Sequence, residues 1–187
     1  MEWTVGTGVS TVRNFKRKNI GQREVSMIRE AAYSDVDAIA DIYNYYLLNT
    51  IITFELDPIT PQDIMQRMEK SKKVGPYLVY EENGEIIGYT YVSKFREKKA
   101  YENSVESTIY LKNGFGGRGI GSRLYSELLS QVVSQRHAII AGIALPNEAS
   151  VRLHEKCGFR KVAHFSEVGR KFGTWIDVGF WQKNGNI

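Results

Sequence analysis

The segment 104-SVESTIYLKNGFGGRGIGSRLYSELLSQV-132 decides the fold of this chain. Residues 104–111 alternate in character, which predicts a strand with two different faces. One face carries Val105, Ser107, Ile109 and Leu111, and the other carries Glu106, Thr108 and Tyr110. Five of the eight residues 114–121 are glycine, and an apolar side chain then recurs every fourth position from Ile120 to Val132, which predicts a helix. A strand, a glycine-rich loop and a helix in this order bring backbone N–H groups onto phosphate oxygens at the positive end of the helix.

Several kinds of phosphate-binding loop share this strand, glycine-rich loop and helix. A dinucleotide fingerprint also needs an acidic residue about 20 positions further on, and none lies between Glu127 and Glu148. A nucleotide P-loop needs Gly-Lys-Ser/Thr, and Gly121-Ser122 lacks the lysine. Two interpretations stay open: a pyrophosphate-binding loop over residues 116–121, and a plain flexible turn. A turn needs only one or two glycines, so the sequence favours the first.

The rest of the chain alternates strands and helices around this segment. Further strands are expected at 25–32, 77–82, 85–93, 138–145, 160–168 and 174–182. Further helices are expected from Ser34 with Asp37 completing a capping box, from Thr60-Pro61-x-Asp63, and from Asn147. Asn83-Gly84 marks a hairpin turn, and residues 169–173 mark another. The order predicts an α/β protein, of mixed α+β type, with helices on both faces of a mixed sheet.

Length and charge limit the possible functions. A chain of 187 residues fits one domain, and we expect residues 1–26 to form a flexible basic arm before a single domain over 27–187. The formal charge of +4 is concentrated in this arm, which holds five bases and two acids, whereas the body holds 20 bases and 19 acids. A nearly neutral body without a basic stripe argues against nucleic-acid binding.

The single cysteine fits a reducing compartment, and the histidines bear on metal binding. A single Cys157 excludes an internal disulfide, and three scattered histidines without metal-ligand spacing predict no metal site. Residues 1–26 contain no apolar core of a secretory signal and the composition predicts no membrane span. We therefore expect a cytoplasmic protein.

Three separated motifs resemble the GNAT acetyltransferases, and within them the phosphinothricin N-acetyltransferase subgroup. They are Ala100-Tyr101 followed by 105-VESTIY-110, the segment 145-LPNEASVRLHE-155, and 173-GTWIDVGFWQ-182. The resemblance spans Ile28 to Gln182 and implies a mixed central sheet of about seven strands flanked by about four helices. Gly116 stands where the phosphate loop of the family usually has Gln or Arg, although Gly116 and Gly117 still offer backbone N–H groups.

The resemblance implies acetyl-CoA as co-substrate, with no metal. It assigns the contacts to acetyl-CoA to Ile109, Tyr110, Leu111, Gly116, Gly117, Arg118, Gly119, Ile120, Gly121, Ser122, Asn147 and Ser150. An alkyl amine is mostly protonated at neutral pH, so acetyl transfer needs a group that takes a proton. By resemblance Glu106 is this general base. The alternative is an acid on an exposed strand face or in an ion pair.

His154 is the second catalytic candidate. In many members of the family a tyrosine at this position protonates the departing thiolate, and an imidazole titrating at about pH 6.5 can do this or orient the substrate. A core histidine bonded to a carbonyl is the alternative. Asn147 can serve as helix N-cap, as pantetheine ligand, or as both. Cys157 is expected to be a packed small residue, which favours direct transfer in a ternary complex over a covalent enzyme intermediate.

The acceptor site follows from the resemblance as well. The residues placed around the acceptor are Phe54, Arg96, Lys98, Tyr101, Ser107 and Lys171. Cations with aromatic walls suit an amino acid with a second anionic or polar head. Taken singly, each is as readily a solvated cation or a core aromatic. Lys98 stands at a position where the family has Arg, which keeps the charge and loses the bidentate fork.

The expected function is acetyl-CoA-dependent N-acetylation of a small amino acid such as phosphinothricin, methionine sulfoximine or methionine sulfone. The first alternative keeps the reaction and changes the acceptor to a polyamine, a peptide N-terminus, another amino acid or an antibiotic. A non-catalytic acetyl-CoA-binding protein and a nucleic-acid-binding module using the basic arm are outside alternatives. By resemblance a homodimer is expected, with Phe180 and Trp181 as candidate interface aromatics or core residues.

Overall fold

The computed structural model describes residues 25–187, and the arm expected over residues 1–26 lies outside the described residues except for its last two. The strands are β1 (Ser26–Glu30), β2 (Tyr77–Glu82), β3 (Glu85–Lys94), β4 (Ser104–Leu111), β5 (Ala138–Leu145), β6 (Arg160–Lys171) and β7 (Thr174–Asn184). The helices are α1 (Val36–Asn49), α2 (Pro61–Lys72), α3 (Ile120–Val132) and α4 (Glu148–Lys156), with short 3-10 turns at Tyr33–Asp35 and Lys99–Tyr101. This confirms the expected order of elements.

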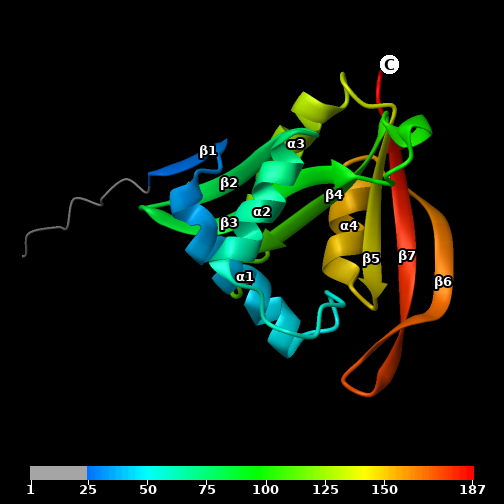
Figure 1. Ribbon diagram of the computed structural model, residues 1–187, viewed down its shortest axis with the longest axis horizontal. Coiled ribbons are helices and arrows are strands. Elements are labelled where there is room, and N and C mark those ends of the chain that lie inside the picture. The colour runs from blue at the N-terminus through cyan, green and yellow to red at the C-terminus, as the bar shows by residue number, and fades with distance from the viewer. Residues whose placement is uncertain (1–24) are drawn as a thin grey trace, which may run out of the picture.

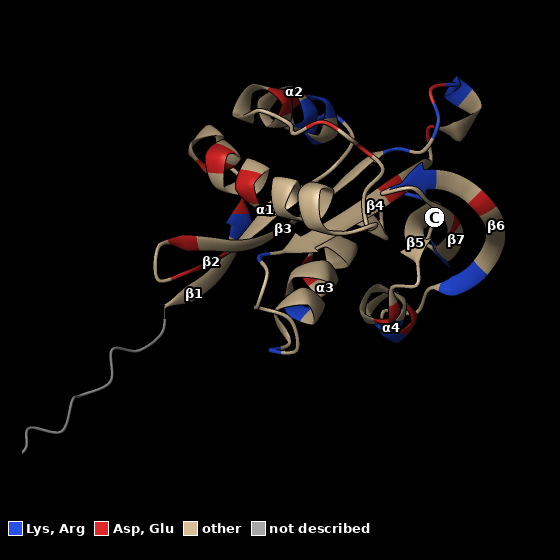
Figure 2. Cartoon of the chain, turned by 90° about the horizontal axis from the view of Figure 1, so that it is seen from below, with Lys and Arg blue, Asp and Glu red and all other residues tan. Residues whose placement is uncertain are grey.

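One seven-stranded sheet organises the molecule, in the order β1-β2-β3-β4-β5-β7-β6. All neighbours are antiparallel except β4 and β5, so the sheet is mixed, as predicted. Figure 2 shows α1 and α2 on one side of the sheet and α3 on the other. Each side has its own core, because neighbouring residues of a strand point to opposite faces. Leu78 and Tyr80 of β2 pack into the core with α3, whereas Tyr77 and Val79 pack with α1 and α2.

Local turn and cap chemistry explains most element boundaries. Thr60 caps α2, since its hydroxyl accepts from the Asp63 N–H at 3.2 Å while the Asp63 carboxylate accepts from the Thr60 N–H at 2.7 Å. Asn83 and Gly84 have φ angles of 53° and 84°, as a two-residue hairpin turn requires.

Two boundaries were predicted wrongly. Ser34 does not cap α1; the Asp35 carboxylate accepts from the Ala32 N–H at 2.8 Å and pairs with Arg29 at 2.7 Å. Ser34 lies inside the 3-10 turn Tyr33–Asp35 that precedes α1, and Asp35 stands at the N-cap position of α1 without a side-chain cap bond. The helical turn therefore begins earlier than expected. The second hairpin turns at Phe172-Gly173 only, so β6 continues to Lys171 through residues that were expected to form the loop.

The two parallel strands separate halfway along their length. β4 and β5 are paired only at Ser104↔Ala138, Val105↔Ile139 and Glu106↔Ile140. Each continues to pair with its outer neighbour, β4 with β3 and β5 with β7, so the sheet opens between them beyond Glu106 (Figure 1). Backbone N–H and C=O groups along this edge of β4 therefore lack a strand partner. The opening places a site in the middle of the sheet.

The C-terminal hairpin decides between the two places expected for its aromatic side chains, interface or core. Trp181 is 2% exposed and belongs to the core, and Phe180 is half-buried. The exposed aromatic side chains of this hairpin are Phe165, Phe172 and Trp175 instead. None of the helices between residues 25 and 187 is both long and apolar enough to cross a membrane.

Candidate active site

The opening between β4 and β5 holds a cavity of about 210 Å³. Its walls are residues 52–54 of the α1–α2 loop, 106–110 of β4, 142–144 of β5, and Asn147, Ser150 and His154 of the α4 region. The sequence motifs that contain Glu106 and His154 are thus brought together, although almost 50 residues separate them. Gly142 is a wall residue that the sequence analysis missed. A glycine inside the otherwise apolar run 138–145 is the signal that could have revealed it, because such a glycine often marks a close approach.

Glu106 lies where the two strands separate. Its side chain points toward β5, since its Oε1 lies 3.4 Å from where a Cβ on Gly142 would stand. Within residues 25–187 no hydrogen bond or ion pair engages its carboxylate. Burial raises the pKa of Glu106, and the charge of Arg96 opposes this shift. A half-buried carboxylate with a raised pKa and no protein partner is a competent general base.

His154 is 3% exposed and is held by the helix that carries it. Its Nδ1 lies 2.8 Å from the carbonyl oxygen of Ser150, one turn earlier, and its ring packs edge-on against Tyr125 and Phe159. A carbonyl can only accept, so Nδ1 carries the proton and Nε2 carries the lone pair of the neutral ring. Burial lowers the pKa of His154, which keeps the ring neutral at pH 7. In this state Nε2 accepts a proton or a hydrogen bond and must gain a proton before it can act as an acid.

Asn147 begins α4, as predicted. Its Oδ1 accepts from the Ser150 N–H at 3.2 Å, which satisfies one free donor of the first helical turn. The cavity reaches the same two residues, so Asn147 combines the cap with a place in the cavity wall. Cys157 is half-buried at the end of α4 and packs against the core, and burial raises the pKa of its thiol. Such a thiol is a poor nucleophile, in agreement with direct transfer.

The glycine-rich loop joins β4 to α3 in a conformation that glycine alone adopts easily. Gly114, Gly117 and Gly119 have φ angles of 87°, 77° and 76°, and a Cβ on any of them would meet nothing within 4 Å. Gly119 precedes Ile120, the first residue of α3, and no side chain caps this helix. The loop therefore presents backbone N–H groups at the positive end of a 13-residue helix to open space, as an anion site does.

Alanine substitutions at Gly119 and Gly116 show whether the loop needs glycine for its backbone conformation. Gly119→Ala places a Cβ at a left-handed φ, which costs about 1–2 kcal/mol, whereas Gly116 has no such φ and no neighbour to meet. We expect Gly119→Ala to lower the free energy of unfolding by about 1 kcal/mol and Gly116→Ala to raise it by about 0.4–1 kcal/mol, since alanine restricts the unfolded chain; urea denaturation measures both. Equal losses in the two variants would contradict this assignment.

Arg118 is bound within the protein. Its Nη2 donates to both carboxylate oxygens of Glu82 at 3.0 Å, and its guanidinium lies 5.2 Å from the centre of the Phe115 ring. These contacts tie the glycine-rich loop to the end of β2. The Nη2 of Arg118 is therefore occupied by Glu82, and a phosphate would have to bind another nitrogen of the guanidinium or replace Glu82.

The six predicted acceptor residues divide into three groups. Phe54 and Ser107 line the cavity with Glu106, but the Ser107 hydroxyl already bonds Tyr125 Oη at 2.7 Å and the Ile140 carbonyl at 3.2 Å. Arg96, Lys98 and Tyr101 line a second cavity of about 470 Å³. The structure does not bring Lys171 into either cavity; its Nζ donates to the carbonyl oxygen of Thr53 at 2.7 Å.

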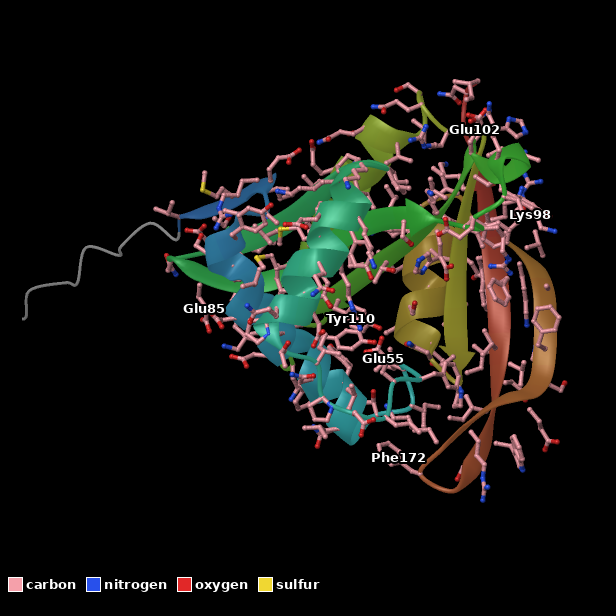
Figure 3. The ribbon with its side chains drawn as sticks, viewed as in Figure 1. Glu55, Glu85, Lys98, Glu102, Tyr110 and Phe172 are labelled. Atoms are coloured by element: carbon pink, nitrogen blue, oxygen red, sulfur yellow. The ribbon has the colours of Figure 1, made fainter. Side chains whose placement is uncertain are left out.

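The second cavity is strongly cationic. It adds Lys73, Lys94, Lys99 and Arg136 to Arg96 and Lys98, against the two acids Glu97 and Glu102. Figure 3 shows Lys98 and Glu102 at this end of the molecule, far from Phe172 at the tip of the β6–β7 hairpin. Ser104 lines this cavity and Glu106 lines the first, and the two residues lie two positions apart on one face of β4. Lys73, Lys94 and Arg136 were missed because they come from three different segments and share no local motif.

A mixed sheet opened between two parallel strands, with a free carboxylate in the opening and a glycine-rich helix start beside it, defines an acyl-group transferase of the GNAT fold. A family model described as "Acetyltransferase (GNAT) domain" matches residues 28–179. The chain therefore belongs to the GNAT acetyltransferase family, which confirms the resemblance seen in the three motifs.

Several characterised relatives are similar over most of the chain. A phosphinothricin N-acetyltransferase of Streptomyces coelicolor is 42% identical over 87% of this chain and 98% of that protein. An L-methionine sulfoximine/L-methionine sulfone acetyltransferase of Salmonella typhimurium is 34% identical over 83% of this chain and 92% of that protein. Among solved structures, a GNAT superfamily phosphinothricin acetyltransferase from Sinorhizobium meliloti in complex with AcCoA has a TM-score of 0.82 at 33% identity, covering 86% of this chain and 89% of that one.

Proposed function

We propose that this chain transfers the acetyl group of acetyl-CoA to the amino group of a small amino acid of the phosphinothricin, methionine sulfoximine or methionine sulfone kind. The observation that carries the proposal is the half-buried Glu106 carboxylate, which has no partner within residues 25–187 and stands where β4 and β5 separate. The names of the Streptomyces and Salmonella relatives support the acceptor class. The acetyl-CoA in the Sinorhizobium structure supports the donor.

The unpaired edge of β4 and the glycine-rich loop suit the two halves of acetyl-CoA. Residues 109–111 offer strand-like backbone groups to the amides of a pantetheine chain entering the opening, with Asn147 and Ser150 on the far side. Residues 116–122 offer backbone N–H groups to the pyrophosphate at the start of α3. Gly116 supplies no side chain to this contact, so the backbone and the helix end carry it.

Glu106 and His154 suit successive proton transfers in the cavity. Glu106 takes a proton from the acceptor ammonium, directly or through a water, and the freed lone pair attacks the thioester carbonyl carbon. Backbone N–H groups of β4 stabilise the oxyanion of the tetrahedral intermediate. Neutral His154 then takes the second amine proton at Nε2 and returns it to the sulfur as the C–S bond breaks. These reaction steps use no metal, and within residues 25–187 no group of three His, Cys, Asp or Glu is placed to bind one.

The cationic second cavity suits the acidic head of the acceptor. Arg96 and Lys98 are the predicted contacts, and Arg96 is near enough to Glu106 to influence its pKa. An acceptor with its amine at Glu106 would direct an anionic or polar head from the first cavity toward these cations. Lys98 supplies a point charge without a bidentate fork, so it can accommodate several kinds of acceptor head group and does not select one of them.

An acceptor panel with release of the CoA thiol as readout tests the proposal. We expect turnover with phosphinothricin, methionine sulfoximine and methionine sulfone, and kcat/KM at least 100-fold lower with a polyamine and with a peptide N-terminus. Preference for a polyamine or a peptide would reassign the acceptor. Tight acetyl-CoA binding without turnover of any amine would indicate a non-catalytic protein.

We further propose that the protein is a cytoplasmic homodimer that uses the edge strand β6. Val162, Phe165 and Val168 of this strand and Trp175 of β7 are each more than half exposed. A long edge strand with exposed apolar side chains favours pairing with a second chain, and a second copy gives a closed twofold contact. We expect sedimentation to give twice the chain mass of 21.3 kDa, and Val168→Lys to give the monomer mass. Leu48→Lys on exposed α1 is the control; a monomeric unmodified protein would contradict the proposal.

A further inference from the structure

The α1–α2 loop is fixed to the two helices on either side of Phe54, a residue that lines the active-site cavity. The Thr53 hydroxyl is 2.6 Å from Tyr43 Oη of α1, and the Glu55 carboxylate accepts from Arg67 of α2 at 2.7 Å. Phe54 lies between these two anchored residues, and residues 52–54 all line the cavity. The loop is thereby held to the helices on one side.

Lys171 holds the same loop from the opposite side. It is the last residue of β6, it is 3% exposed, and its ammonium donates to the Thr53 carbonyl oxygen at 2.7 Å. Among the described residues no carboxylate pairs with it. A buried ammonium without an opposite charge costs free energy, and burial lowers the pKa of Lys171 accordingly. A contact of this cost, made 118 residues away in sequence, calls for a role beyond stability.

Gly169 receives the aromatic ring of Phe54. A Cβ on Gly169 would lie 2.1 Å from Cε1 of Phe54 and 2.7 Å from Cδ1 and Cζ of the same ring. The φ of Gly169 is outside the left-handed region, so its backbone conformation does not require glycine. Glycine is required because the Phe54 ring occupies the space of a side chain at this position. The ring is thus seated on the β6–β7 hairpin while its neighbour Thr53 is bonded to Lys171.

We propose that Lys171 and Gly169 are positioning residues that hold Phe54 as a wall of the acceptor cavity and so determine which acceptor side chains fit. This rests on the proposed acetyl transfer, and it changes the predicted role of Lys171 from direct ligand to support. The Phe54 ring is the group that touches the acceptor. Its position depends on one hydrogen bond and one missing side chain, both on the β6–β7 hairpin.

The first test compares Gly169→Ala in the natural sequence and in the Phe54→Ala background. In the natural sequence the new Cβ displaces the ring, and we expect KM for phosphinothricin to rise about 10-fold or more, with kcat and KM for acetyl-CoA within twofold. In the Phe54→Ala background the same substitution meets no ring and should change no constant more than twofold. Equal effects in both backgrounds, or an unchanged acceptor KM in the first, would overturn the proposal.

The second test uses Lys171→Met, which keeps the stem and removes the ammonium. We expect the same rise in acceptor KM, again absent in the Phe54→Ala background, whereas a direct ligand would lower affinity in both. Arg170→Met is the control, since Arg170 is exposed and lies over Trp175.

Hydrogen exchange of the amides of residues 51–56 gives a readout that does not depend on turnover. We expect faster exchange in Lys171→Met and no change in Arg170→Met; unchanged exchange in both would overturn the proposal. If the natural protein turns over no acceptor but exchange is faster in Lys171→Met, the proposed acetyl transfer is wrong and the support of the loop by Lys171 stands.

Discussion

Replacement of Glu106 by Gln is expected to lower kcat by about 10²–10⁴-fold, the range that a positioned general base contributes. The substitution keeps the size of the side chain and removes its ability to take a proton from the acceptor ammonium. Binding of acetyl-CoA is expected to stay within twofold, because the proposed cofactor contacts lie elsewhere on β4, on α4 and on the glycine-rich loop. Steady-state kinetics together with calorimetric titration measure the two quantities.

The matched control is Glu127→Gln, an exposed carboxylate on α3. It removes the same charge at a residue that lines neither cavity. We expect kcat to stay within twofold. Full turnover of the Glu106→Gln enzyme with acetyl-CoA bound would end the assignment of Glu106 as base.

The pH dependence gives the same assignment a second measurement. Burial raises the pKa of Glu106, and only the ionised carboxylate can accept a proton. We therefore expect kcat/KM to fall as the pH drops through this raised pKa, above the ordinary range of a glutamate. An acid limb at an ordinary glutamate pKa would show that the carboxylate is hydrated rather than half-buried in the working enzyme.

The Glu106→Gln substitution should raise the stability of the protein while it lowers its activity. A carboxyl group whose pKa is raised on folding stabilises the protein only while protonated, and this contribution is lost as the pH rises through the folded pKa. At pH 7 the ionised Glu106 therefore opposes folding. We expect the Glu106→Gln variant to have a higher Tm than the natural protein at pH 7 and a smaller difference at low pH. A residue kept at a cost in stability and needed for turnover is catalytic and not structural.

The sequence predicted the strand–loop–helix unit well because its signals are local. Alternation over 104–111, five glycines and an apolar repeat each depend on neighbours within a few positions, and β4 and α3 occupy the predicted residues. The capping role of Asn147 was predicted for the same reason. Ser34 failed as a cap because it lies inside a 3-10 turn before α1, where the Asp35 carboxylate accepts from the Ala32 N–H and pairs with Arg29, a residue outside the local pattern.

The shape of the site could not be predicted, because it depends on where pairing stops. Nothing local to Ser107 or Ala141 indicates that β4 and β5 separate there, since both strands continue to pair on their outer edges. The position of the Lys171 side chain differs from the predicted one for a related reason. A cation near the acceptor is compatible with its sequence position, and only the packed structure turns its ammonium toward the Thr53 carbonyl.

Substitution of His154 by Asn is expected to lower kcat by about 10²-fold or more while the enzyme stays folded. The amide nitrogen of Asn can replace Nδ1 as donor to the Ser150 carbonyl, and nothing then replaces Nε2. Thiol release at saturating acetyl-CoA and acceptor measures the loss. His164→Asn is the control, because His164 is an exposed residue of β6 that bonds Asp177 at 2.7 Å.

The companion variant His154→Gln distinguishes the two roles proposed for the ring. Its amide places an acceptor oxygen near the position of Nε2, which can orient an amine but cannot carry a proton to the sulfur. If His154 moves the proton, His154→Gln is expected to be as slow as His154→Asn, with the acceptor KM close to that of the natural enzyme. Recovery of kcat in His154→Gln would leave orientation as the role of His154. Equal, natural turnover in both variants would make it a core histidine held by a carbonyl.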